Sequence, residues 1–252
     1  MSSIRHDVTV SPESASPEGN PLVAALEVAF QRSRAMDAPL GVRLKVIADE
    51  VRALSIEFAD AVDVFVSRLE RAGAGDSAPR VGETMPPFVL PDETGRLVTL
   101  SGLLATGPVA IAFHRGHWCP YCRLNAVALA EVQDQIKPVQ IVAISAERRP
   151  YTQALKTEAG ADFPFLTDFG NAYALSLNLA IWVDDGMSDM IAGAGWDVPT
   201  YQGDEAWILP VPAVFIVDQS GVIRTRHVDP DYRRRMEIED LLAAVKAVKP
   251  PA

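Results

Sequence analysis

Cysteine is scarce in this sequence of 252 residues: only Cys119 and Cys122 occur, three positions apart. A secreted scaffold stapled by disulfides uses more cysteines, spaced to close larger loops, so the count argues against that class. Two thiols this close together indicate either redox chemistry or half of a metal site.

Basic residues are also in the minority. Lys and Arg number 23 against 33 Asp and Glu, which gives a net charge of -10. Binding to a phosphate backbone needs a basic surface, so no nucleic-acid partner is expected. The one compact basic run, Arg233 to Arg235, is interpreted as the solvated start of a helix.

Long apolar runs are absent too. No stretch approaches the roughly 20 apolar residues that cross a bilayer, so no membrane partner is expected. The first residues lack the apolar core of a signal peptide, and the expected location is therefore cytoplasmic. Hydrophobic residues at 48% and charged residues at 22% are ordinary for a chain that buries a core.

Composition divides the chain into three parts. Residues 1–20, rich in Ser, Pro and Glu, are expected to form a flexible arm, residues 21–72 a helical extension, and residues 81–252 an α/β redox domain. Helices are expected over 22–36 and, as one longer helix, over 42–71. Apolar residues in the longer helix recur every three or four positions. This stripe consists of Ile47, Val51, Leu54, Phe58, Ala61, Phe65 and Leu69. We expect it to cover the rest of the same chain; pairing with a second subunit in a homodimer is the alternative.

After a Gly/Ala-rich linker at 72–79, short strands alternate with helices. The expected strands are a hairpin at 88–90 and 96–100, buried strands at 109–113, 139–144 and 165–166, and an antiparallel pair at 213–217 and 222–228. The expected helices cover 120–136, 151–159, 171–177 and 238–248. Residues 178–208 show no periodicity. Trp196 and Trp207 in that segment suit either a substrate mouth or, by default, the core.

The two cysteines fall where the strand 109–113 gives way to a helix. Proline is favoured at the first helical position, so Pro120 makes Cys119 the N-cap. Unpaired N–H groups and the helix dipole are then expected to stabilise the Cys119 thiolate, with added positive potential from Arg115 and His117. Cys122, three residues on, is placed to close an internal disulfide.

Two other interpretations use the same residues. The cysteines could be inert core residues, although the polar loop before them predicts incomplete burial. A zinc ion could use His114, His117, Cys119 and Cys122, but a strand running straight into a helix wraps an ion poorly, so neither metal nor cofactor is expected. Trp118 and Tyr121 either cover the sulfurs or pack in the core. Glu147 follows a strand near the cleft; a solvated surface position is favoured over a role as proton acceptor.

The segment Trp118-Cys119-Pro120-Tyr121-Cys122 after a strand resembles the active site of the thioredoxin superfamily. It is most similar to the peroxiredoxin-like proteins of the alkyl hydroperoxide reductase and thiol-specific antioxidant group. The resemblance spans 81–248 and includes the segments 85–92 and 211–218. It implies a thioredoxin-like α/β fold, with a central mixed sheet flanked by helices. Pro212 matches the cis-proline that faces the cysteine pair in the superfamily.

The sequence departs from the peroxiredoxin pattern P-x-x-x-T-x-x-C with a later Arg. In that register Cys122 takes the attacking position, Cys119 replaces Thr, Arg115 replaces Pro, and Pro212 falls near the expected Arg. The thioredoxin register names Cys119 as the attacking thiol. We favour Cys119, because an N-cap thiol is expected to be more exposed than one a turn inside. The Pro-Tyr dipeptide also matches glutaredoxins, although the hairpin and the 178–208 insertion do not.

The resemblance implies a thiol-dependent antioxidant enzyme. It would reduce hydrogen peroxide or organic hydroperoxides through a Cys119/Cys122 dithiol–disulfide cycle, with a reducing thiol system of thioredoxin or glutathione type. One alternative is a thioredoxin-like oxidoreductase acting on disulfides. Another is a non-catalytic redox sensor or interaction protein whose N-terminal helices signal the state of the pair.

Overall fold

A five-stranded mixed sheet forms the centre of the protein in a computed structural model that describes residues 20–248. Apart from Asn20, the expected N-terminal arm lies outside this range. The strands are β3 (Val109–Phe113), β4 (Gln140–Ser145), β5 (Phe165–Thr167), β8 (Ala213–Val217) and β9 (Ile223–Val228), in the order β5-β4-β3-β8-β9. The first three are parallel, whereas β8 runs antiparallel to both β3 and β9. The expected β-α-β unit and thioredoxin-like fold class are confirmed.

The strands form because apolar side chains cover both faces of the sheet. All five residues of β3 are buried, as a parallel strand between two layers requires. Ala110 and Ala112 face one hydrophobic cluster, while Val109, Ile111 and Phe113 face the other. The helices around the sheet are α4 (Leu100–Leu104), α5 (Pro120–Val132), α6 (Arg149–Ala159), α7 (Ala172–Ser176) and α10 (Ile238–Val248), with a 3₁₀ turn at Phe169–Asn171. Helix α5 ends at Val132, a turn earlier than expected.

A hairpin precedes the sheet, as the sequence predicts. It pairs β1 (Val89–Pro91) with β2 (Leu97–Thr99) in antiparallel register. Asp92 shapes its turn. Although burial acts to raise the pKa of Asp92, hydrogen bonds from Thr94 and Arg96 lower it to about 2.

Three helices precede the hairpin and the central sheet: α1 (Pro21–Arg34), α2 (Leu40–Leu54) and α3 (Ile56–Arg71). The single helix expected over 42–71 is wrong, because Ser55 interrupts it with extended backbone (φ -148°). The Ser55 hydroxyl accepts the N–H of Phe58 and caps α3, a role in which serine is strongly preferred. The break leaves Leu54 exposed, while Ile47, Val51, Phe58, Phe65 and Leu69 are buried.

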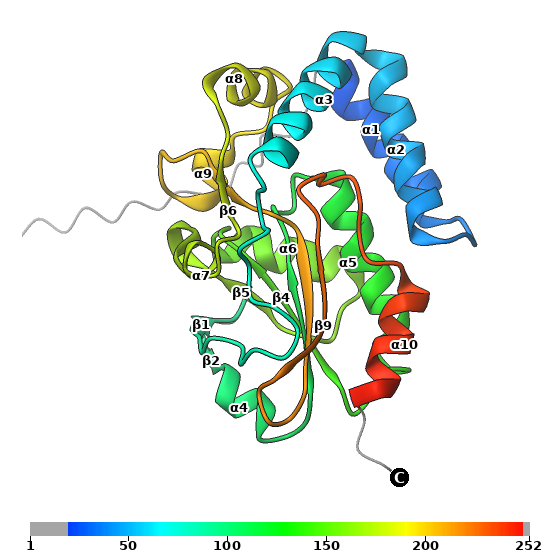
Figure 1. Cartoon of the computed structure of the whole chain (residues 1–252). Coiled ribbons are helices and arrows are strands. Elements are labelled where there is room, and N and C mark those ends of the chain that lie inside the picture. Colours follow the sequence, from blue (N-terminus) through cyan, green and yellow to red (C-terminus); the bar gives the residue numbers. More distant parts are fainter. Residues whose placement is uncertain (1–19, 249–252) are drawn as a thin grey trace, which may run out of the picture.

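The N-terminal helices pack against one part of the remaining chain. Helices α1 and α2 pack on α5, and α3 packs on α8 (Asp185–Gly193), an arrangement that can be followed in Figure 1. Apart from exposed Leu54 and half-buried Ala61, the apolar stripe is therefore buried within one chain. None of the helices in residues 20–248 has the length and apolarity needed to span a bilayer.

The segment 178–208 is ordered despite its lack of periodicity. It contains β6 (Ala180–Trp182), α8, α9 (Val198–Gln202) and β7 (Ile208–Pro210), and β6 and β7 pair antiparallel. Each element is too short to reveal a period. Trp196 and Trp207 both pack, partly buried, against the main hydrophobic cluster.

Candidate active site

Cys119 and Cys122 sit at the start of α5, where the sequence places them. Strand β3 ends at Phe113, Pro120 is the first residue of α5, and Cys119 is the N-cap with extended backbone. The Cys122 N–H donates to the Cys119 carbonyl at 2.9 Å. Both cysteines are unbridged thiols in this structure.

Burial does not distinguish the two thiols. Cys119 is 1% exposed and Cys122 is 0% exposed, so the expected incomplete burial and greater exposure of Cys119 are both wrong. Both belong to the hydrophobic cluster that includes the N-terminal helices. The sequence did not show that these helices lie over the start of α5.

The charge environment separates the pair. The Cys122 sulfur accepts the backbone N–H of Arg115 at 3.3 Å and the Nη2 of Arg235 at 3.2 Å. Burial acts to raise the pKa of Cys122, but the hydrogen bond from Cys119 and the Arg235 charge lower it well below its usual value. Burial raises the pKa of Cys119, and the bond to Cys122 adds to that rise. The Arg115 N–H and the Arg235 guanidinium therefore favour a thiolate at Cys122 over one at the helix N-cap.

Arg235 is the residue that sequence reasoning missed. The interpretation of 233–235 as a solvated helix start is wrong for this side chain, since Arg235 is buried and α10 begins only at Ile238. Its guanidinium also donates to the carbonyls of Tyr232 and Arg234. The sequence signal for it is the later Arg of the peroxiredoxin pattern, which is expected near Pro212.

Arg115 approaches the cysteines and His117 does not. The Arg115 guanidinium lies 3.9 Å from the Tyr232 ring centre and 4.9 Å from that of Trp118. Its charge acts to lower the pKa of both thiols, as expected. The His117 Nδ1 is instead 2.6 Å from a Glu147 oxygen, and its ring stacks on Tyr151.

Glu147 is fully buried, so the surface position favoured for it is wrong. Burial raises the pKa of Glu147, although its bonds to His117 oppose the rise. One oxygen accepts the backbone N–H of His117 at 2.7 Å. Gly116 (φ 142°) passes so close to this carboxylate that a Cβ there would collide with it. Glu147 therefore fixes the loop that carries Arg115 and leads to Cys119.

The histidines do not converge on the sulfurs to form a metal site. The His114 Nε2 is 3.2 Å from the Asn125 side-chain oxygen, and His117 is bound to Glu147. In residues 20–248 no three His, Cys, Asp or Glu side chains are arranged to hold an ion.

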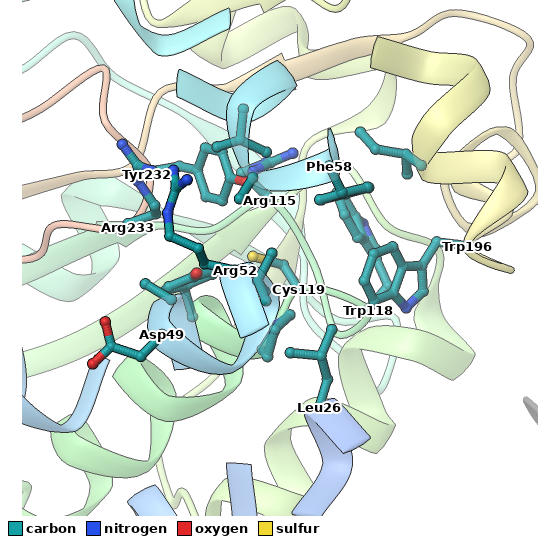
Figure 2. A pocket seen from close by; sticks show the side chains of 17 residues that line it. Leu26, Asp49, Arg52, Phe58, Arg115, Trp118, Cys119, Trp196, Tyr232 and Arg233 are labelled. Atoms are coloured by element: carbon teal, nitrogen blue, oxygen red, sulfur yellow. The ribbon is translucent and has the colours of Figure 1, made fainter. Parts of the chain in front are cut away.

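A small cavity of about 110 Å³ adjoins Cys119. Figure 2 shows the Cys119 sulfur between an aromatic side, formed by Phe58, Trp118 and Trp196, and a charged side with Arg52 and Arg233. Helices α1, α2, α3 and α8 supply much of the lining, and Arg115, Pro120 and Tyr121 complete the part near the loop. Cys122 does not line the cavity. Only Cys119 of the pair therefore faces the space that a small molecule can enter.

Pro212 differs from its expected role. It is buried just before β8, but the peptide bond before it is trans; in residues 20–248 only Lys137–Pro138 is cis. The backbone there continues β7, and the Val211 N–H donates to the Leu179 carbonyl at 2.7 Å, which holds the segment extended. Pro212 does not line the cavity.

Comparisons with known proteins identify the family of the chain. The Redoxin family model matches residues 80–245. The chain is 24% identical over 170 residues to the chloroplastic peroxiredoxin Q of Sedum lineare, covering 67% of this chain and 78% of the relative. It is 29% identical over 172 residues to the thiol:disulfide interchange protein DsbE of Vibrio cholerae, covering 66% and 77%.

Among solved structures, the peroxidoxin BcpB of Mycobacterium tuberculosis superposes with a TM-score of 0.52 at 19% identity. The alignment covers 68% of this chain and 99% of that one. At this identity the likeness shows the shared fold. The Redoxin match begins at residue 80, so helices α1 to α3 precede the matched region.

Proposed function

The chain belongs to the Redoxin family, and from that premise we propose that it is a thiol peroxidase that reduces hydrogen peroxide or organic hydroperoxides. The observation that carries the proposal is the Cys122 sulfur, which lies between the Arg115 N–H and the Arg235 guanidinium. A thiolate is the nucleophilic form of cysteine, and these donors favour it. Cys119 is placed beside it to resolve the product.

We assign the attack on peroxide to Cys122 rather than to Cys119. The preference for Cys119 depended on greater exposure and on a thiolate at the helix N-cap, and the structure provides neither. Cys119 occupies the position of the peroxiredoxin Thr, between the cavity and the Cys122 sulfur. A peroxide entering the cavity thus meets Cys119 and Arg115 on its way to the thiolate.

The reaction then proceeds in two steps. The Cys122 thiolate attacks one peroxide oxygen, the O–O bond breaks, and the leaving oxygen takes a proton to become water or an alcohol. Cys122 is now a sulfenic acid. The Cys119 sulfur attacks the Cys122 sulfur, a disulfide forms, and the sulfenic oxygen leaves as water with the thiol proton. The pair has supplied two electrons, which a reducing thiol of thioredoxin or glutathione type must replace.

The sequence also led us to expect a cytoplasmic location and, as an alternative, a homodimer. A cytoplasmic location stays a prediction. A homodimer through the N-terminal helices is not part of this proposal, because most of the stripe that suggested it is buried within the chain.

Disulfide exchange is the second candidate function, favoured by the likeness to DsbE and by the C-x-x-C spacing. Protein disulfides are large substrates, and the burial of both thiols under helices disfavours them. The redox-sensor alternative predicts slow turnover with every reductant and a change in partner binding on oxidation.

The single variants Cys119→Ser and Cys122→Ser test the assignment. In Cys119→Ser we expect rapid formation of a sulfenic acid at Cys122, trapped by dimedone and located by mass spectrometry. Cys122→Ser should react with peroxide no faster than a free thiol. Rapid sulfenic acid formation at Cys119 in Cys122→Ser would reverse the roles. A wild-type chain that keeps both thiols in excess peroxide is not a peroxidase.

A further inference from the structure

Three helices stand between the cysteine pair and solvent. We call α1 to α3, residues 21–71, the helical cover. Buried residues of the cover, among them Phe30, Ile47 and Phe65, share one hydrophobic cluster with Cys119 and Cys122. The thiols are thus part of the interface between the cover and the redox domain.

Ion pairs fasten this cover at several points. Glu27 of α1 binds Arg123 at 2.7 Å, and Arg43 of α2 binds Glu131 at 2.8 Å; both partners lie on α5. On α3, Asp63 binds Arg233 at 2.6 Å. Arg68 of α3 also pairs with Asp184, the N-cap of α8. Helix packing and charge pairing together hold the cover closed over the pair.

The space left beneath the cover suits a small molecule. A water molecule needs only about 10–15 Å³ of the volume open to a water-sized sphere, so a cavity of about 110 Å³ admits on the order of ten waters, enough for a small thiol and far too little for a folded chain. A protein dithiol reductant presents its sulfur on folded chain, and a single helix is already about 10–12 Å wide. Such a surface cannot reach Cys119 while the cover is closed.

We propose that the oxidised pair is reduced by a low-molecular-weight thiol, which enters this cavity with its sulfur and attacks Cys119. The inference depends on the proposed function only in taking the Cys119–Cys122 disulfide as the state to be reduced. It names the electron donor for this chain by size and chemistry.

The chemistry of the cysteine pair and the geometry of the cavity both indicate that the small thiol attacks the Cys119 sulfur. In thiol–disulfide exchange the thiol of lower pKa leaves faster. The surroundings of Cys122 favour its thiolate, with Arg235 at 3.2 Å, so Cys122 is the better leaving group. Attack must then fall on Cys119, which is also the cysteine that lines the cavity.

The electrons balance over two small thiols. The thiolate of the first attacks the Cys119 sulfur, the disulfide breaks, and Cys122 leaves as a thiolate. The thiolate of the second attacks the sulfur of the bound small thiol, and Cys119 leaves as a thiolate that takes up a proton. The products are the dithiol protein and one small-molecule disulfide.

The test measures the reductive half-reaction alone, so that it does not depend on peroxide. The full chain is oxidised with diamide, freed of reagent, and reduced either by glutathione or by reduced thioredoxin, with free thiols counted over time. We expect the second-order rate constant for glutathione to exceed that for thioredoxin by at least about tenfold, because docking of a protein requires the cover to open. An equal or larger constant for thioredoxin overturns the proposal.

Two matched variants on α3 test the cover as the cause. Asp63 pairs with Arg233 outside the cover and also with Arg52 inside it, whereas Asp60 pairs with Arg52 inside the cover. Asp63→Asn should raise the thioredoxin rate constant by up to about fivefold, the worth of one surface ion pair, and should change the glutathione constant no more than Asp60→Asn does. Asp60→Asn should leave the thioredoxin rate constant unchanged. A thioredoxin rate constant that Asp63→Asn does not alter contradicts the role of the cover.

The two proposals fail in different ways. Reduction of the diamide-formed disulfide by glutathione in a protein that does not consume peroxide supports the donor assignment and removes the peroxidase. Peroxide consumption with faster reduction by thioredoxin does the opposite. Failure of diamide to form the disulfide overturns both.

Discussion

Replacing Arg235 should make the reactive thiol harder to ionise. In Arg235→Met the long side chain is kept and the charge is lost. The Nη2 of Arg235 lies 3.2 Å from the Cys122 sulfur, and its side chain is buried, so little solvent screens the interaction. The remaining donor that the structure places on this sulfur from the preceding loop is the Arg115 N–H at 3.3 Å.

The size of the effect follows from the strength of one hydrogen bond to a charged group. Such bonds contribute about 1.5–3 kcal/mol, and one pKa unit corresponds to about 1.36 kcal/mol. The pKa of Cys122 should therefore rise by about 1–2 units. Reactivity depends on the thiolate, which is present above the pKa of the folded protein and is lost as the pH falls through it. The acid limb of the pH–rate profile should move to higher pH by the same amount.

The assay is the rate of reaction with hydrogen peroxide in single turnover between pH 4 and 9. Arg234→Met is the matched control, because the Arg234 side chain is 62% exposed and forms only long ion pairs of 3.4–3.7 Å. Arg235→Lys restores the charge with different geometry and should recover part of the shift. A folded Arg235→Met protein with the wild-type pH profile would refute the reasoning, as would an equal shift in Arg234→Met.

Three further predictions concern stability, each measured by chemical denaturation. Gly116→Ala should destabilise the fold by about 3 kcal/mol or more, because the strained backbone and the collision with Glu147 both cost free energy. Gly82→Ala is the control: Gly82 has a φ of 92° but open space around it, so the loss should be only about 1–2 kcal/mol. Equal losses in the two variants would contradict the close approach of Gly116 to Glu147. Ser55→Ala removes the N-cap of α3 and should cost about 1 kcal/mol, and no loss would mean that the cap is dispensable. Because its pKa is lowered, the ionised Asp92 carboxylate stabilises the fold at neutral pH, and this stabilisation is lost as the pH falls from about 4 towards 2. The free energy of unfolding of Asp92→Asn should therefore vary less with pH in that window. A slope equal to that of the wild type would exclude the Asp92 carboxylate as the source of the dependence.

The sequence predicted the fold where the physics is local. Continuous apolar runs marked β3 and β8, and proline at the first helical position marked the start of α5. The break at Ser55 was missed because the apolar period continues across it, although serine is itself a capping signal. The short elements of 178–208 were missed because none is long enough to show a period.

The sequence predicted only those site residues that lie close to the cysteines along the chain. Proximity in sequence identified Cys119, Cys122 and Arg115, but the contact from Arg235 depends on tertiary folding over more than a hundred residues. The location of the thiolate depends on that distant charge as well as on local helix geometry. The burial of Glu147 and the packing of the helical cover over Cys119 also depend on tertiary contacts, so the sequence did not predict them.

The order of the central sheet has a consequence for self-association. Its outer strands are β5, which has only three residues, and β9, which carries Arg224 and Arg226. The chain bridges both borders itself, through Asp92 with Leu166 on one side and Thr84 with Val222 on the other. Short, charged or covered borders deprive a foreign strand of a template for pairing. Copies of this protein that meet at high concentration should therefore resist pairing through the edges of the central sheet.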